Sequence, residues 1–402
     1  MNNKKPNISS PILLILMAAI LVFVFITIDS RKDQNGSTDL NSAYGSNAVR
    51  AKVLAITEEG TTKLGEIEQA YQVFDVEIME GEFKGVVTSV DYGLRQIASN
   101  QVKIQPNEVL LVSVGVRPDT GEVRAFFTDF VRSKSILYLF LVFVFFSILI
   151  SGWKGVRSLI AILFSLGVIV FFILPQILGG RDPVLVSIIG AFVFLSISQY
   201  LVYGWNLKTH SAVIGILISL ILTGIISAFF INFTRLTGFG DENAMFLVQV
   251  TSQNINMRGL LLAGMIIGAL GVLDDLVISQ ASAIFELHAV NPDLGFTGLY
   301  HRAMNIGRDH VAATINTLVL AYAGASLPML LLFSISNQNP AMLINISFIA
   351  EEIVRTLVGS IGLIASIPIT TGLAAIVATQ HQKFPWMEKF LGPDNQGQGH
   401  SH

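Results

Sequence analysis

About eight stretches of this sequence are largely apolar, and most are close to the ~20 residues that an α-helix needs to cross the hydrocarbon core of a bilayer. They are residues 12–28, 136–152, 159–178, 184–202, 212–231, 259–285, 311–333 and 356–379. Of the whole chain, 52% is hydrophobic and only 13% is charged. One or two soluble cores would not bury that much apolar surface. The sequence therefore predicts an all-α polytopic membrane bundle of about eight spans.

The basic residues that flank the apolar stretches indicate the topology. If the spans alternate in direction, the following residues all lie on one side: Lys4, Lys5, Lys154, Arg157, Lys208, Arg302, Arg308, Lys383 and Lys389. Basic residues gather on the cytoplasmic side of membrane proteins, so both termini are expected in the cytoplasm and the chain in the plasma membrane. Residues 1–30 resemble a signal peptide but lack an A-x-A-like cleavage site, which favours an uncleaved anchor.

Residues 31–133 differ from the rest because they are polar and alternate with period 2. Phe74, Val76 and Ile78 alternate with Asp75 and Glu77, the pattern of a half-buried strand. Similar runs predict a small all-β extracytoplasmic domain of five or six strands, a sandwich or a barrel, inserted after the first span. The domain plan is an anchor at 1–30, this domain at 31–133, a helical membrane domain at 134–382 and a cytoplasmic tail at 383–402. We expect a docking or gating module at 31–133 and assign it no site.

Two adjacent aspartates interrupt the apolar stretch GALGVLDDLVISQ, residues 268–280. A carboxylate at bilayer depth costs several kcal/mol, so Asp274 and Asp275 need a partner, a proton or water. At 100° per residue, Asp275 shares one helix face with Gly264, Gly268 and Gly271, which predicts that this face packs against another helix inside the bundle. Two neighbouring carboxyls in a low dielectric resist double ionisation, so the pair is a candidate proton-binding site. The alternative is a hydrated helix end near the cytoplasm.

The next helix supplies candidate partners at a comparable depth. Arg308 and Asp309 stand at its cytoplasmic start, and Asn316 and Thr317 lie on its small or polar side. We expect Arg308 to act as a charge partner and the other three to give hydrogen-bond support to the aspartates. The alternative role for Arg308 and for His310 is orientation of the chain by positive charge.

Several classes of function are disfavoured. There is no cysteine, and no H-x3-H or H-E-x2-H spacing, so no metal or other cofactor is expected. A net charge of −3 without basic runs argues against nucleic acid. An intramembrane enzyme would need a nucleophile or metal triad at one depth, and none is found. We expect a protein that is not an enzyme.

Near the outer end, two segments read as surface helices. Residues 341–355 suggest an interfacial helix carrying a Glu351–Arg355 pair at i, i+4, although this stretch could also belong to the last span. Residues 240–251 suggest a second segment that lies along the outer surface. The last span contains Pro368, where a kink is expected.

The stretches GALGVLDDLVISQASAIFE, RAMNIGRDHVAATINTLVLAYAGASLPMLLL and EEIVRTLVGSIGLIASIPITTGLAA resemble the YibE/F family of bacterial multi-pass membrane proteins, over most of residues 45–380. More distantly, a glycine-rich span with deep aspartates, a cytoplasmic hairpin and a Thr/Asn-bearing span is similar to the core of the RND exporters and of SecD and SecF. In those proteins deep aspartates bind and release the protons that drive export. This resemblance implies that role for Asp274 and Asp275.

Together these features predict a proton- or cation-coupled secondary transporter or exporter. Its partners would be the lipid bilayer, an unidentified small-molecule, ion or peptide substrate, and either a second copy or another membrane protein. The alternative is a non-transporting accessory or assembly factor whose outer β domain binds a partner.

Overall fold

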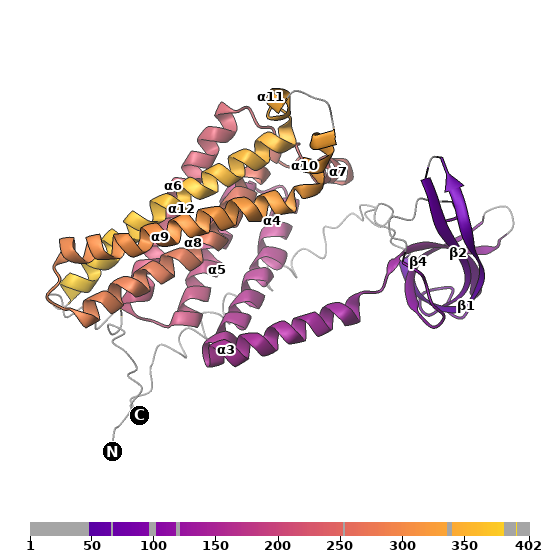
Figure 1. The fold of residues 1–402 in the computed structure, drawn as a ribbon, viewed down its shortest axis with the longest axis horizontal. Coiled ribbons are helices and arrows are strands. Elements are labelled where there is room, and N and C mark those ends of the chain that lie inside the picture. Colours follow the sequence, from indigo (N-terminus) through magenta and orange to yellow (C-terminus); the bar gives the residue numbers. More distant parts are fainter. Residues whose placement is uncertain are drawn as a thin grey trace, which may run out of the picture. The chain divides into compact units, whose positions relative to one another are not determined.

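The computed structural model describes residues 48–65, 67–95, 102–117, 121–251, 254–335, 340–381 and residue 391. The predicted anchor at 1–30, with its span at 12–28, lies outside the described residues, and so does the predicted tail at 383–402 apart from Leu391. The chain divides into two compact units at residues 146 and 147, a β unit and a helical unit (Figure 1).

The β unit is a small antiparallel sheet, as predicted. Its strands are β1 (Ala48–Leu64), β2 (Ile67–Ile78), β3 (Val87–Tyr92), β4 (Val109–Val116) and β5 (Val123–Phe130). They are ordered β3-β2-β1-β4-β5. The sheet curls, and its two edge strands come close to each other. The Thr88 hydroxyl on β3 donates a hydrogen bond to the Val123 carbonyl on β5 at 3.1 Å. The five strands therefore form a small, partly open barrel, one of the two forms expected for this domain.

The predicted alternation along β2 decides which side chains fill this barrel. Phe74, Val76 and Ile78 are buried. They pack in one cluster with residues of β1 and β4, including Val53 and Leu110. Two register shifts in β1, after Val53 and after Ile56, mark irregularities of the kind that bend a strand.

The helical unit follows with these elements: α3 (Ser133–Val168), which starts in the β unit, η1 (Ile169–Ile173), α4 (Leu174–Leu178), α5 (Pro183–Tyr203), α6 (Leu207–Phe233), α7 (Glu242–Val250), α8 (Met257–Val290), α9 (Phe296–Ala325), α10 (Leu327–Ile335), α11 (Pro340–Leu343) and α12 (Ser347–Gln380). Five helices in the described part of the chain are long and apolar enough to cross a membrane. The bent pair α9 and α10, with an angle of 65° between them, would make a sixth.

The expected count of eight spans is therefore not confirmed. The stretches 136–152 and 159–178 fall in one helical run, Ser133–Leu178. Within that run the two stretches form two helices that meet at a kink at Gly152, whose φ of 56° and ψ of −134° are not helical. The predicted division between these two stretches is therefore present. The stretch 311–333 is split instead, between α9 and α10.

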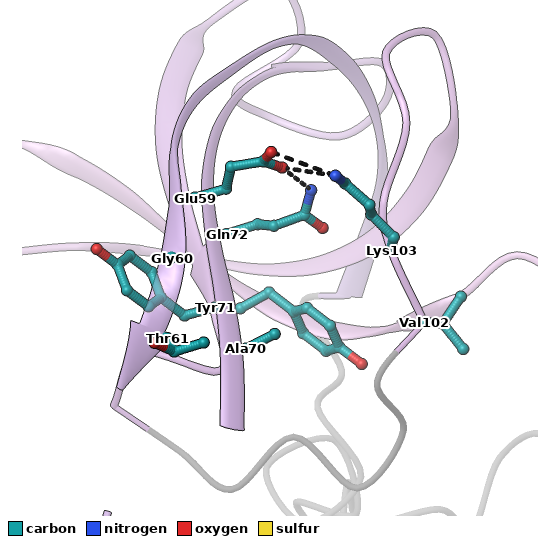
Figure 2. A pocket seen from close by; sticks show the side chains of 9 residues that line it. Glu59, Gly60, Thr61, Ala70, Tyr71, Gln72, Val102 and Lys103 are labelled. Atoms are coloured by element: carbon teal, nitrogen blue, oxygen red, sulfur yellow. Dashed lines mark hydrogen bonds and ion pairs between the residues drawn. The ribbon is translucent and has the colours of Figure 1, made fainter. Parts of the chain in front are cut away.

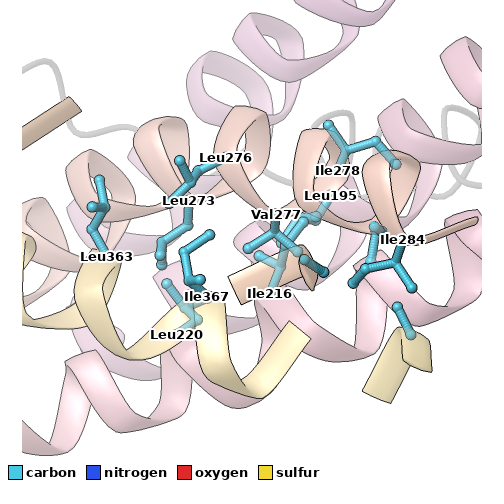
Figure 3. Close-up of a cluster of buried hydrophobic side chains, with 14 of the residues drawn as sticks. Leu195, Ile216, Leu220, Leu273, Leu276, Val277, Ile278, Ile284, Leu363 and Ile367 are labelled. Carbon is cyan, nitrogen blue, oxygen red and sulfur yellow. The ribbon is translucent and has the colours of Figure 1, made fainter. Parts of the chain in front are cut away.

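The helical unit is built around α8. Its large apolar side chains pack against α6 and α12, and Figure 3 shows Leu273 and Val277 of α8 beside Ile216 of α6 and Ile367 of α12. Many large apolar side chains of α3, α5 and α6 stay exposed on the outside of the unit. Exposed apolar surface on this scale is typical of helices that face lipid, as in integral membrane proteins.

Of the two segments expected near the outer end, one forms a separate short helix and the other belongs mainly to α12. Residues 240–251 do include a separate short helix, α7, with no buried residue. In contrast, α12 runs without a break from Ser347 to Gln380, through Pro368, so Glu351 and Arg355 belong to a long apolar helix and not to a separate interfacial one. The predicted Glu351–Arg355 pair is wrong, because Arg355 bonds Glu352, three residues before it.

Candidate functional site

Helix α8 holds both aspartates near the middle of its 34 residues. The helix starts at Met257, where the Asn256 side chain accepts a hydrogen bond from the Gly259 amide at 3.1 Å. Leu273 and Leu276, on either side of the aspartate pair, are fully buried. The aspartates therefore interrupt the packed part of α8 and not a frayed end.

Asp274 has a partner that the sequence pattern did not identify. The Nε2 of Gln199 on α5 donates a hydrogen bond to the Asp274 carboxylate. Gln199 is only 1% exposed, and its own Oε1 has no hydrogen-bond partner. Asp274 itself is half-buried. The sequence signal for this contact is a single glutamine, Gln199, in the apolar run that precedes YLVYGW.

Aromatic rings lie close to this contact. The rings of Tyr200, near the end of α5, and of Trp205 are 4.8 Å apart and tilted by 34°, and the Tyr200 hydroxyl lies 2.8 Å from Nδ1 of His210. Gln199 precedes the end of α5 at Tyr203 by about one helical turn, or ~6 Å. The Asp274 contact therefore lies near the end of α5 that the sequence predicts to be cytoplasmic, and tyrosine and tryptophan are typical of such helix ends.

Asp275 and the glycine stripe are placed differently from the prediction. Asp275, Gly264, Gly268 and Gly271 are all exposed in the described structure. A β-carbon added at Gly264 or Gly271 would meet no atom within 4 Å, and at Gly268 it would meet only the Tyr322 hydroxyl at 3.6 Å. Within one chain this face is therefore not packed. The large side chains on the other faces of α8 decide its packing, because glycine has little surface to bury.

The predicted partners on α9 do not join the aspartates. Arg308, Asp309, Asn316 and Thr317 are exposed. Among the described residues no hydrogen bond or ion pair connects any of them to the aspartate pair, and the Thr317 hydroxyl donates to its own helix, to the Ala313 carbonyl at 3.0 Å. Their role at the site stays a prediction.

A second polar contact ties α8 to α9 and α12. Gln280, 1% exposed, donates through Nε2 to the Ala303 carbonyl at 2.9 Å and to the Thr371 hydroxyl at 2.8 Å. The sequence pattern did not reveal it. This contact fixes three helices next to the aspartates.

The small-residue packing that the sequence pattern assigned to α8 occurs between α6 and α12. Buried small residues recur every fourth position of α6, at Ser211, Gly215, Ser219, Thr223 and Ser227. A β-carbon at Gly215 would lie 2.7 Å from the Thr370 hydroxyl, and one at Gly362 would overlap the Thr223 hydroxyl. This period of four was visible in the sequence and is typical of helices that approach closely in membranes.

At the opposite end of the bundle, Glu351 holds the loop that follows α6. Its carboxylate, on a residue only 5% exposed, accepts hydrogen bonds from the amides of Gly238 at 3.1 Å and Gly240 at 3.2 Å. Successive backbone amides form a concavity that suits an anion. Glu351 is therefore a structural link between α12 and that loop, in place of the pair with Arg355 expected from the sequence.

The β unit contains a cleft of about 430 Å³ beside the ends of β1 and β2 (Figure 2). Glu59 and Lys103 form an ion pair at 3.0 Å on its wall. Gln72 accepts a hydrogen bond from the Ile104 amide at 2.8 Å, which ties the 102–104 segment to β2. The hydrogen bond and the charge of Lys103 lower the pKa of the Glu59 carboxyl. The volume lies in the range of small-ligand sites, though its polar groups already pair with one another.

No group of three or more His, Asp or Glu side chains that could hold a metal ion is found among the residues that the structure describes.

The comparisons with known proteins agree with one part of the predicted resemblance. A family model described as YibE/F-like protein matches residues 139–380, which include α8, α9 and α12. No curated protein and no solved structure matches the chain. Since the family match covers well over half of the 402 residues, the chain belongs to the YibE/F-like protein family.

Proposed function

We propose that this protein is a proton- or cation-coupled secondary transporter or exporter that binds the coupling ion at Asp274 and Asp275. The observation that carries the proposal is the contact between Asp274 and Gln199, two polar side chains surrounded by apolar helices. Carboxyls inside membrane helices are costly and commonly serve ion or proton pathways. A purely structural helix contact would be made at lower cost without a carboxylate.

The location of the pair supports access from one side. Asp274 bonds Gln199, which lies about one helical turn before the end of α5 and next to Tyr200 in the chain, and the neighbouring Asp275 is exposed. An ion from the adjacent aqueous phase would have a short path to Asp275 and then to Asp274. Binding there changes the charge next to the α5–α8 contact, which is a means to change how these helices pack.

The roles proposed on α9 belong to the same mechanism. Arg308 would serve as charge partner, and Asp309, Asn316 and Thr317 would give hydrogen-bond support in a conformation in which α9 approaches the aspartates. The distant similarity to the RND exporters and to SecD and SecF supports an ion-driven cycle of this kind. It identifies no cargo.

The topology and the partners are part of the proposal too. The chain would lie in the plasma membrane with both termini in the cytoplasm and the β unit outside. A small molecule, an ion or a peptide would be the substrate, and a second copy or another membrane protein would cover the exposed glycine face of α8.

A comparison of cell contents tests transport even while the cargo is unidentified. Strains that lack the protein would carry the wild type, Asp274→Asn or the control Asp293→Asn, at matched amounts of membrane-inserted protein. A transporter with its ion site at Asp274 predicts that the same compound accumulates in cells without the protein and in cells with Asp274→Asn. Contents equal to wild type in the Asp274→Asn strain would contradict the proposal.

The second candidate is an accessory or assembly factor, favoured by the cleft beside β1 and β2. In that case a change on the cleft wall, such as Lys103→Glu, would reproduce loss of the protein, and Asp274→Asn would not. The same set of strains therefore separates the two functions.

A further inference from the structure

The amide of Gln199 is used on one side only. Its Nε2 donates to Asp274, while its Oε1 is buried without a hydrogen-bond partner. More than nine in ten buried polar groups have a partner, so an orphan acceptor next to a carboxylate needs an explanation. A primary amide can either donate or accept a hydrogen bond, since it carries an NH₂ donor and a carbonyl acceptor on one planar group.

We propose that the ion bound at Asp274 is a proton, and that Gln199 is the positioning residue that accommodates both protonation states of this carboxyl. This inference rests on the proposed function. In the ionised state, the Gln199 amide N–H donates to the Asp274 carboxylate. When a proton from water adds to that carboxylate, the amide turns over and the new Asp274 O–H donates to Oε1. Only an O–H bond is made or broken, and in both states one end of the amide is hydrogen-bonded to Asp274.

The site offers few ligands for a calcium ion, which takes six to eight oxygens. The side chains that flank the aspartates, Leu273 and Leu276, are apolar and buried. Within the described residues, one amide oxygen comes from Gln199 and two carboxylates come from Asp274 and Asp275. A proton needs only one acceptor.

The charged surroundings also favour exchange of a proton. Asp275 on the same helix places a second negative charge beside Asp274, and Tyr203 on α5 interacts electrostatically with both aspartates. In the part of the chain that the structure describes, no lysine, arginine or histidine forms an ion pair with Asp274. Uptake of a proton would neutralise this charge without a further side chain.

Infrared difference spectra after a change of pH test this on the full-length protein in liposomes, without a substrate. The inference predicts a carboxyl C=O band that titrates in wild type and is lost in Asp274→Asn. In Gln199→Met that band should move to higher frequency, because the O–H has lost its acceptor. Replacing choline chloride with sodium or potassium chloride should leave the titration midpoint unchanged.

A second measurement avoids dependence on how Gln199→Met folds. In the wild type, labelling glutamine with ¹³C at the side-chain amide should reveal an amide band that changes together with the carboxyl band. The absence of a coupled amide signal would overturn the role of Gln199. Its presence with the same midpoint would support that role.

The outcomes separate this inference from the proposed function. If sodium or potassium shifts the midpoint of the Asp274 band, the coupling ion is not a proton alone, and the ion site itself stands. If the titrating band persists in Asp274→Asn, the ion site is not at Asp274, and both proposals fall.

Discussion

Gln199 and Asp274 lie 75 positions apart in the chain, and the hydrogen bond between their side chains joins α5 to the middle of α8. In contrast, Asp275 is exposed and makes no hydrogen bond among the described residues. The two aspartates are therefore not equivalent. Asp274 is the carboxyl that is hydrogen-bonded to a neighbouring helix, α5, and Asp275 is the carboxyl that is open to solvent or to a partner.

The first prediction concerns the glycines of α12 and α8. Gly362→Ala should destabilise the protein by about 1–3 kcal/mol, because its β-carbon would overlap the Thr223 hydroxyl in a packed interface. Gly264→Ala is the matched control, since nothing lies within 4 Å of the added carbon. Replacing a helical glycine at an open position should be neutral or slightly stabilising. Thermal unfolding in detergent, followed by size-exclusion chromatography, measures both, and equal melting temperatures for the two variants would refute the close α6–α12 contact.

The second prediction concerns Glu351. Glu351→Met should lower the melting temperature, because it removes the oxygen that accepts hydrogen bonds from two glycine amides in a buried place, and loss of such a bond costs about 1–3 kcal/mol. Glu352→Met should have a smaller effect, since the Glu352 pair with Arg355 is partly exposed. Hydrogen exchange at residues 236–241 should rise in Glu351→Met and stay unchanged in Glu352→Met. The reverse order would show that the loop is held by other contacts.

The third prediction concerns Gln280. Gln280→Leu removes two buried hydrogen bonds and leaves the Ala303 carbonyl and the Thr371 hydroxyl without that donor. A cost of about 1–3 kcal/mol is expected for each buried group left unsatisfied. A double-mutant cycle with Thr371→Val, read by thermal unfolding, isolates the Gln280–Thr371 interaction. Strictly additive effects of the two changes would exclude a direct interaction.

The fourth prediction concerns pH dependence in the β unit. Lys103 lowers the pKa of Glu59 below its ordinary value of 4.5, and Lys103→Met should raise it toward that value. Because the folded-state pKa is the lower one, this pair stabilises the fold above pH 4.5, and the contribution is lost as the pH falls through the folded-state pKa. Carboxyl ¹³C NMR of glutamate-labelled protein, with Glu59→Gln to assign the signal, gives the pKa. A Glu59 pKa that is the same with and without Lys103 would contradict the pairing.

The sequence predicted features that depend on local pattern. Alternation at Phe74, Val76 and Ile78 predicted the β unit, and long apolar runs predicted the membrane helices. Pattern was less informative about how every apolar stretch divides into helices. The stretches 136–152 and 159–178 lie on either side of a kink at Gly152, as predicted, but the stretch 311–333 is split between α9 and α10.

The candidate site was only half predictable for a different reason. Asp274 and Asp275 stand out in an apolar run, but helical periodicity gives only the faces of a helix and not the identity of its neighbours. The glycines of α8 suggested a packed face, whereas the bulk of Leu270 and Leu273 decides the packing in the single chain. Gln199 lies on a helix for which no motif drew attention, and only the three-dimensional contact identifies it.

The central claim is that the charge state of Asp274 drives transport. The most direct test reconstitutes the protein in liposomes loaded with the compound that accumulates in cells lacking it, imposes a pH gradient, and records release of that compound. The account predicts gradient-dependent release with wild type and with Asp293→Asn, whose exposed side chain lies in the loop between α8 and α9. It predicts no release with Asp274→Asn reconstituted in equal, folded amounts. Release by Asp274→Asn at the wild-type rate would contradict it.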